Sequence, residues 1–415
     1  MSSIFKGVKG GMECGVLLTL AVLALGVIGP SGDVRAAGGP MEPARDSYRV
    51  LAPIESGNLL LFPVVRGDKT PGPTPFLTLD EGIKSGQVEV TEAGRVSGLV
   101  RPRTQFQRHY DGPYRPIPQP QRGDQVNTLV LVNNSDKPLL LLAGEIVTGG
   151  KQDRVIAKDR IVPAGSDPID LGVFCIEPGR WTGETASFGA SAKAQANSIM
   201  VQPTVREKAM VAKNQQEVWD SVNGMISQMQ AAASPSSRSG GTMGGPESSG
   251  AGLGTSSYAR AMQDSKVIAK VDEAAAPVMK GREQVLAQLR QEHAVGVVVA
   301  VRGEIVWADI FADTDLLARY WTKLVRSYAA ESLVVGERHT APSVSDAQHF
   351  LDAPAGGTET SIGDVGVYRY RELRSGHTET FVLESLLEGA RYDVHISKLK
   401  VRGMVAQINP PQFYR

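Results

Sequence analysis

The stretch that decides the fold is residues 127–143, NTLVLVNNSDKPLLLLA, in which two apolar runs enclose a polar turn. Residues 127–132 have the apolar and β-branched composition of a strand. Residues 133–136 predict a turn, because Asn and Asp tolerate a left-handed backbone and bond to nearby peptide groups. The second run, residues 138–143, is predicted to form a strand that pairs with the first. This stretch therefore indicates a domain built largely from sheet.

Strand-like segments continue on both sides of this stretch. Residues 48–65 contain two apolar runs separated by Gly57-Asn58, which predicts two strands and a turn, and a further strand is expected at Val88 and Val90. The remaining expected strands are 153–161, 168–176, the pair within 294–310 with its turn at 302–304, and three C-terminal segments at 365–373, 379–386 and 392–401.

Helices are expected mainly in the middle of the chain. A short helix should follow Thr78 or Asp80, either of which can cap it. Apolar residues at helical spacing predict longer helices at 205–230 and at 314–333, the latter capped at Thr314. Residues 258–292 predict one or two helices with a break at Pro277.

These elements predict an α+β fold in which antiparallel sheet units flank a helical middle. We expect a single domain over residues 48–400. Residues 231–257 are rich in Ser, Gly and Pro and cannot bury enough apolar surface to fold, so they are predicted to be a disordered insertion within that domain. Two domains meeting near residue 260 are the alternative.

The N-terminus has the three-part pattern of a secretory signal. Lys6 and Lys9 precede an apolar run at 15–29, and Val34-Arg35-Ala36 fits a cleavage site. Residues 1–36 are therefore predicted to be a signal peptide, and residues 37–47 a linker. The protein is expected to be exported, periplasmic or extracellular, with no stable membrane span after cleavage. An uncleaved N-terminal membrane anchor is the alternative, although the run is short for a bilayer span.

Composition excludes several classes of protein. Lys+Arg and Asp+Glu both number 44 in the 415 residues, and this neutral balance argues against a nucleic-acid binder. The two cysteines exclude a disulfide scaffold, and removal of the signal would leave only Cys175. The apolar fraction of 41% is ordinary for a globular chain with a sizeable core.

The glycine-rich segment 144–154, GEIVTGGKQDR, superficially resembles a phosphate-binding loop. The loop of nucleotide triphosphatases requires Gly at position 145, which is Glu145, and a hydroxyl at 152, which is Gln152. That class is therefore rejected. The segment is either a glycine-rich turn or a polar ligand site in which Lys151, Gln152 and Arg154 donate hydrogen bonds to an anion or a ribose.

The segment 175–181, CIEPGRW, has the Cys-to-Arg spacing of a rhodanese-like loop. Glu177 would repel an anion there, and Pro178 lacks a backbone N–H, so Cys175 is interpreted as a small buried apolar residue. The six histidines form no metal-ligand pattern, and no nucleophile elbow is present. No catalytic residue, metal ligand or cofactor is therefore predicted.

These two segments together resemble a known family. The series from Asn133 through 140–145 to 150–154, followed by 173–181, is similar to the domain named for its association with ADP-ribosylglycohydrolases and rhodanese-phosphatases. Residues 294–311, the helix at 321–329 and His395-Ile396-Ser397 resemble later parts of that domain. The resemblance covers residues 48–400 apart from the insertion. It implies an ADP-ribose- or nucleotide-related ligand, and its motif positions would be Gly144, Glu145, Lys151, Gln152, Arg154, Cys175, Glu177, Arg180 and Trp181.

Two functions remain open. In the favoured one, the protein is a non-enzymatic interaction or structural domain of the cell envelope with a protein partner, Arg180 pairs with Glu145 or Glu177, and Trp181 packs on the sheet. In the alternative, the two segments bind or process a small anionic, sugar- or nucleotide-like ligand: Lys151 and Arg180 hold the anion, and Trp181 stacks on a ring. Glu145 or Glu177 would then act as a base.

Overall fold

The computed structural model describes the greater part of residues 48–401. The described ranges are 48–67, 75–92, 129–150, 152–178, 199–233, 255–280, 282–333, 339–355, 357–375 and 378–401, with the backbone alone at 187–188. These ranges all belong to one compact unit that spans Asp46–Arg415. The predicted signal peptide and linker lie outside the described residues. The fold class is α+β, as predicted.

A nine-stranded sheet, here the large sheet, joins the two ends of the sequence. Its path runs β1–β3–β14–β15–β19–β18–β17–β16, with β2 also paired to β3, and every pairing is antiparallel. The N-terminal β3 pairs directly with β14, so the expected separate sheet units form one continuous sheet. The strands are β1 (Tyr48–Val50), β2 (Ile54–Ser56), β3 (Leu59–Arg66), β14 (Ala294–Val301), β15 (Glu304–Phe311), β16 (Thr358–Asp364), β17 (Tyr368–Ser375), β18 (Thr378–Leu387) and β19 (Ala390–Lys400).

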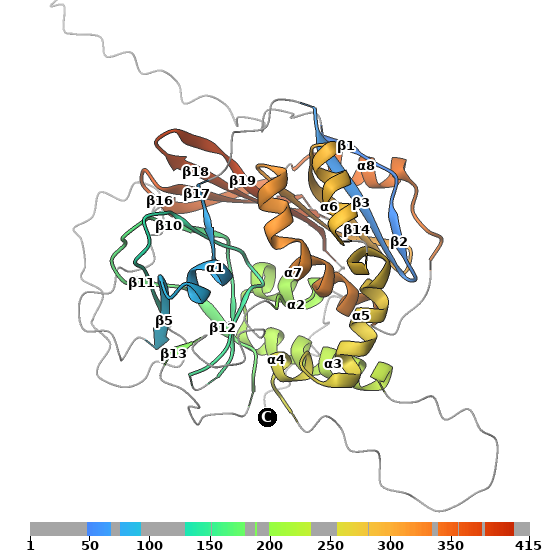
Figure 1. Cartoon of the computed structure of the whole chain (residues 1–415), viewed down its shortest axis with the longest axis horizontal. Coiled ribbons are helices and arrows are strands. Elements are labelled where there is room, and N and C mark those ends of the chain that lie inside the picture. Colours follow the sequence, from blue (N-terminus) through green and yellow to red (C-terminus); the bar gives the residue numbers. More distant parts are fainter. Residues whose placement is uncertain are drawn as a thin grey trace, which may run out of the picture. The chain divides into compact units, whose positions relative to one another are not determined.

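Both faces of the β1–β3–β14–β15 region are buried, because helices cover each face (Figure 1). Leu59 and Leu61 point into the main core, which includes helix α7 (Thr314–Ser332). Leu60 and Phe62 point into a second cluster that includes helix α8 (Val344–Asp352) on the opposite face. This accounts for the near-continuous apolar composition of these strands, since a strand covered on both sides has no solvent face.

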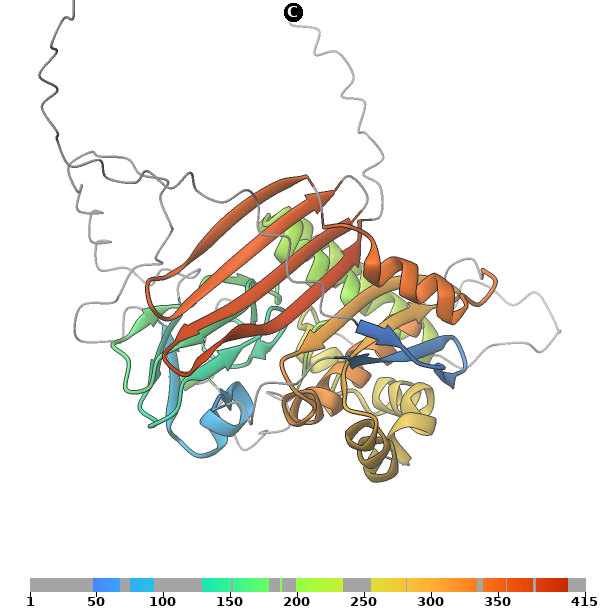
Figure 2. The same cartoon turned by 90° about the horizontal axis from the view of Figure 1, so that it is seen from above.

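The C-terminal strands differ in part from the prediction. The three predicted segments correspond to β17, β18 and β19, and a fourth strand, β16, forms the edge beside them (Figure 2). The sequence of β16, TETSIGD, is polar and largely exposed, so it lacks the apolar alternation that marks a strand. Helix α8 was not predicted either. Its N-terminus is a capping box between Ser343 and Asp346.

Three small sheets and helix α1 form a second structural region, here the small-sheet lobe. The lobe has its own apolar cluster, which includes Leu79, Leu131 and Leu141. Its elements are β4 (Leu77–Thr78), α1 (Leu79–Lys84), β5 (Val88–Glu92), β6 (Leu129–Asn133), β7 (Leu139–Leu141), β8 (Ile146–Val147), β9 (Arg154–Ile156), β10 (Arg160–Val162), β11 (Ile169–Asp170) and β12 (Val173–Cys175), and β13 (Ser187–Phe188) pairs with β5.

The predicted pairing between residues 127–132 and 138–143 is wrong. Strand β6 pairs with β5 and β11, whereas β7 pairs with β10 and, in parallel, with β4. The side-chain amide of Asn133 ties the turn between the two strands to the end of β10, donating to the carbonyl oxygens of Lys137 (2.8 Å) and Pro163 (2.9 Å). Leu140 then packs in the main core while Leu141 packs in the lobe, so β7 connects the two cores.

The helical middle is more interrupted than its periodicity suggests. The predicted helix at 205–230 breaks at Lys213, whose φ is +52°, between a π-helical turn η3 (Lys208–Ala212) and α3 (Gln215–Ala233). Pro277 does not break a helix. It lies on the exposed side of α5 (Ser265–Lys280), where water can hydrogen-bond to the backbone carbonyl that the proline leaves without an N–H partner. The other helices here are α2 (Pro203–Glu207), α4 (Tyr258–Ala261) and α6 (Arg282–Gln291).

Both ends of the segment 231–257, which was predicted to be disordered, are ordered in the structure. Residues 231–233 are the last turn of α3, and Ser257 is a fully buried N-cap of α4. Residues 234–254 lie outside the described part of the chain. The helix at 314–333 is confirmed, with Asp313 as the capping residue in place of Thr314. Among the described helices, none is both long and apolar enough to cross a membrane.

Candidate functional site

The structure brings the two motif segments together. Strand β9 pairs with β12, so that Arg154 lies opposite Cys175. Asp153 connects the segments further: its N–H donates to Oε2 of Glu177 at 3.2 Å, and its carbonyl accepts from the N–H of Ile176 at 3.0 Å. Ser257 closes the cluster by donating to Oδ2 of Asp153 at 2.8 Å. The two motif segments therefore lie together, as a ligand site formed by both would require.

The described motif side chains nevertheless point into the protein. Glu145, Gln152 and Arg154 have no exposed area, and Glu177 is 2% exposed. Lys151, Arg180 and Trp181, the other predicted ligand residues, lie outside the described residues. The part of the motif that the structure describes is thus core.

Among the described residues, the ionic partner of Glu145 is Lys323; Arg180, the partner that the sequence suggested, lies outside the described residues. Its Oε1 accepts from Nζ of Lys323 at 2.7 Å, and its Oε2 accepts from the N–H of Leu142 at 2.7 Å. Burial works against the charge of Lys323, but the two carboxylates of Glu145 and Asp80 outweigh it and raise the pKa of this lysine. Lys323 therefore stays charged and joins α7 to the lobe.

Cys175 is a structural residue in this arrangement. Its backbone forms two hydrogen bonds with the side-chain amide of Gln215, at 2.9 and 2.8 Å. The side chain is 2% exposed, and burial raises the pKa of its thiol despite the nearby charge of Arg154. A reactive thiolate requires the opposite shift, so the interpretation of Cys175 as a small buried residue agrees with its surroundings.

The densest polar cluster in the described structure surrounds Asp309 on β15. Oδ2 of Asp309 accepts from Nη1 of Arg206 at 2.8 Å and from the hydroxyl of Tyr328. Oδ1 accepts from Nε1 of Trp307 at 3.0 Å and from the hydroxyl of Ser397 at 2.8 Å. The guanidinium of Arg206 also stacks over the Trp307 ring, 4.6 Å from its centroid. Every lone-pair direction of this carboxylate is therefore occupied by a donor.

His395 extends the cluster to the small-sheet lobe. Its Nδ1 lies 2.6 Å from Oδ2 of Asp159, and its Nε2 lies 3.2 Å from Oδ1 of Asp309. The other oxygen of Asp159 accepts from the N–H of Ala143 at 2.7 Å, and the ring of Phe311 packs against the imidazole. We call Asp159, Arg206, Asp309 and His395 the charge quartet. Its members are 0–1% exposed.

The quartet is electrostatically self-compensating. Burial alone would raise the pKa of Asp309, but the charge of Arg206 and the bond from His395 hold it well below its usual range. Burial alone would lower the pKa of His395, but Asp159 and Asp309 together raise it to about 9. Two carboxylates thus face one guanidinium and one imidazolium, and no net charge remains inside.

Sequence reasoning did not assign any of the four quartet residues to a site. Two signals were present in the sequence. One is Asp309, the single charged residue in the apolar strand VWADIF, and the other is the sequence HIS at 395–397, which supported only the family resemblance. Arg206 lies in the segment 205–230, for which the sequence predicts only a helix. Only the folded chain shows that these charges, up to 236 positions apart, are paired.

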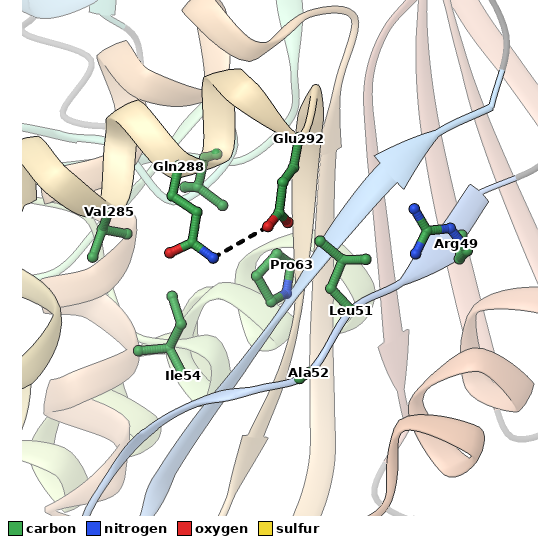
Figure 3. Close-up of a pocket in the computed structure, with 9 residues that line it drawn as sticks. Arg49, Leu51, Ala52, Ile54, Pro63, Val285, Gln288 and Glu292 are labelled. Atoms are coloured by element: carbon green, nitrogen blue, oxygen red, sulfur yellow. Dashed lines mark hydrogen bonds between the residues drawn. The ribbon is translucent and has the colours of Figure 1, made fainter.

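A groove lies between the edge of the large sheet and α6 (Figure 3). Pro63, which has no amide hydrogen, lines the groove where the edge strand is interrupted between β1 and β2. The volume is about 480 Å³, within the range of small-molecule sites. Apolar side chains form most of its lining, and Nε2 of Gln288 donates to Oε1 of Glu292 at 3.2 Å on its rim. The lining residues are Arg49, Leu51, Ala52, Ile54, Pro63, Val285, Gln288, Leu289 and Glu292.

The groove lacks the groups that catalysis requires. Glu292 is the single carboxylate among its described lining residues, and no Ser, Cys, His or Lys accompanies it. None of the described motif residues is among its lining residues. Within the described ranges there is also no group of three or more His, Cys, Asp or Glu side chains that could hold a metal ion.

Comparison with known proteins identifies the chain at the level of family. Searches of curated proteins and of solved structures found no match. A family model matches residues 47–399, which is the whole described fold and confirms the resemblance drawn from the two motif segments. The chain therefore belongs to the ARPP-1 family, the ARG and Rhodanese-Phosphatase-superfamily-associated Protein domain.

Proposed function

We propose that the protein is a non-enzymatic interaction or structural domain. The observation that carries this proposal is the inward orientation of Glu145, Gln152, Arg154 and Glu177, which leaves them 0–2% exposed. Buried charges that are paired and hydrogen-bonded serve the fold, because a ligand cannot reach them without opening it. The motif then marks the residues that hold the lobe to the rest of the domain.

The groove at α6 supports a binding role for the surface. It offers apolar area with hydrogen-bonding groups at its rim but only one carboxylate, Glu292, and no described nucleophile or base beside it. Such a lining suits retention of an apolar group from a partner and not bond cleavage.

We also propose that the protein is exported. The pattern of residues 1–36 supports a signal peptide, and the mature chain would begin at Ala37. The test is intact-mass measurement of the protein recovered from the periplasm or medium of an export-competent host. A mass that lacks residues 1–36 is expected. The full-length mass in the membrane fraction would instead indicate an N-terminal anchor.

The functional proposal is tested by ligand-induced shifts in melting temperature. Inorganic phosphate, ribose 5-phosphate, AMP and ADP-ribose are added to the wild type, to Arg180→Ala and to Glu145→Gln. We expect a lower melting temperature in Glu145→Gln and no stabilisation by any compound. Stabilisation of the wild type that disappears in Arg180→Ala would contradict the proposal and support ligand binding.

One observation favours that second candidate, a small anionic ligand at the two motif segments. Among the described residues, Nε2 of Gln152 is buried and has no hydrogen-bond partner. A buried donor left unpaired costs about 1–3 kcal/mol, so a ligand oxygen at that nitrogen would be stabilising. Gln152→Leu provides the control. If Gln152 binds the ligand, this variant should lose the shift in melting temperature that phosphate produces in the wild type. If Gln152 binds no ligand, phosphate should shift the melting temperature of neither protein.

A further inference from the structure

We propose that the charge quartet is a proton-linked clasp: His395 takes up a proton on folding, and loss of that proton at alkaline pH releases the small-sheet lobe from the large sheet. This inference concerns the stability of the domain and does not depend on the proposed function.

The four members come from separate parts of the fold. Asp159 lies in the connection between β9 and β10 of the small-sheet lobe, while Arg206 lies in α2. Asp309 and His395 lie on the neighbouring strands β15 and β19 of the large sheet. Asp159 is therefore the lobe's member of the quartet, and its bond to His395 crosses between the two regions.

The charges around His395 favour a doubly protonated imidazole. Its two ring nitrogens lie near carboxylate oxygens, at 2.6 Å for Asp159 and 3.2 Å for Asp309. Nδ1 donates to Asp159, because an ionised carboxylate only accepts, whereas Nε2 forms no hydrogen bond but lies within ion-pair distance of Asp309. Neither carboxylate can turn away, because its other oxygen is held, by the Ala143 N–H in Asp159 and by Arg206 in Asp309.

Among the described residues near the quartet, no other group takes over this titration. The phenols that approach it are Tyr320 and Tyr328 from α7 and Tyr370 from β17, and burial raises the pKa of each well above 10. Arg206 stays charged, since Asp309 outweighs the effect of burial and raises its pKa. Loss of the proton from His395 would therefore leave two buried carboxylates facing one cation.

The sign of the pH dependence follows from the direction of the shift. The pKa of His395 is raised from an ordinary 6.5 to about 9 by Asp159 and Asp309, against the effect of burial. The stabilisation is therefore complete below pH 6.5 and is lost as the pH rises to about 9. The loss corresponds to about two orders of magnitude in the folding equilibrium constant. Lys398 acts in the opposite sense above pH 8, because burial lowers its pKa to about 8.

The first experiment observes the proton on the wild-type protein. Nitrogen-15 NMR of the imidazoles should show His395 protonated on both nitrogens at pH 7.5, with a titration midpoint near 9. The exposed His349 on α8 provides an internal reference signal. A neutral His395 at pH 7.5 would overturn the proposal, and this measurement needs no variant that must fold.

The second experiment tests the release of the lobe. Hydrogen exchange is compared between pH 6.5 and 9.5, after correction for the intrinsic rate, in wild type, Asp159→Asn and His349→Gln. Protection should fall by tenfold or more in β7, β9 and β10 of wild type and His349→Gln, with less change in β14 and β15. In Asp159→Asn the loss of protection between the two pH values in β7, β9 and β10 should be at least tenfold smaller than in wild type. Lys398 contributes equally in all three proteins. Equal loss in both regions, or the same profile in Asp159→Asn, would refute the clasp.

Discussion

Two sets of ion pairs attach the small-sheet lobe to the rest of the domain, and they differ in exposure. The charge quartet is sealed in the interior at 0–1% exposure. The second set lies along α7, where Arg319 binds Glu81 of α1 near the surface, with Nε 2.9 Å from Oε1. One turn further along the helix, Lys323 binds both Asp80, at 2.9 Å, and the buried Glu145. Along α7 the ion pairs thus range from an exposed one at Arg319 to a buried one at Lys323.

The comparison shows that burial, not the number of ion pairs, determines what each contact does. An exposed pair exchanges water for a partner at little net gain, so its removal changes stability little. A buried pair contributes little over an apolar replacement, but removal of one partner leaves an uncompensated charge that water cannot reach. The quartet should therefore be intolerant of single substitutions, whereas the surface end of the α7 series should be tolerant.

The largest effect is expected from Asp309→Asn. This change leaves the charge of Arg206 without its carboxylate and weakens the bond from His395. We expect the free energy of unfolding to fall by about 3–5 kcal/mol, as measured by urea denaturation. Asp315→Asn is the matched control, since Asp315 is an exposed partner of Arg290, and it should cost less than 1 kcal/mol, roughly the value of a surface pair. Similar losses in both variants would contradict the distinction.

Glu145→Gln should have the next largest effect. Lys323 keeps Asp80 as a partner, so the expected loss is about 2–3 kcal/mol. A double-mutant cycle with Lys323→Met measures the coupling between the two side chains by urea denaturation. A coupling energy near zero would show that the buried pair is unimportant.

Gly144→Ala tests the backbone that brings the lobe against Arg206. Gly144 has φ +93°, and an added Cβ would lie 3.0 Å from Cδ of Arg206. We expect a loss of about 2 kcal/mol from strain in a backbone conformation that L-residues rarely adopt. Gly86→Ala is the control, because Gly86 has φ +71° and open space around it, so the difference in melting temperature between the two variants reports the contact with Arg206. Equal shifts would exclude a role for that contact.

The smallest effect is expected at the exposed end of α7. The Glu81→Gln and Arg319→Gln cycle should give a coupling energy below about 1 kcal/mol that disappears in 1 M salt, because salt screens exposed charges. The Glu145–Lys323 coupling should persist in the same salt. A salt-resistant Glu81–Arg319 coupling would remove the contrast between the two ends of the series.

Local structure followed well from the sequence. The turn at Gly57, the cap at Thr78 and the amphipathic stripe of α7 each depend on neighbours within a few residues, and all are present in the structure. Pairing was less predictable: β6 and β7 appeared to be partners because they are adjacent in the chain. They belong to different sheets, and the Asn133 amide at the turn between them bonds Pro163, 30 positions away, which no local pattern reveals.

The candidate site shows the same division. The sequence brought out Glu145, Gln152, Arg154 and Glu177 as charged or polar residues among glycines, and the structure confirms that their two segments meet. Their orientation could not be predicted, because a polar side chain near a turn can face either the solvent or the interior. Its direction depends on partners that the local sequence does not show. Lys323, the partner of Glu145, is 178 positions away on a helix read only for its apolar face.

The sequence by itself determined the family, the α+β class and most of the helices and strands, because these depend on composition, period and short motifs. The tertiary structure alone decided that N-terminal and C-terminal strands form one sheet and that the described side chains of the motif face inward. It also decided that Asp159, Arg206, Asp309 and His395 neutralise one another. The physical reason is that a buried charge is tolerated only opposite a compensating one, and the chain supplies that partner from a distant segment.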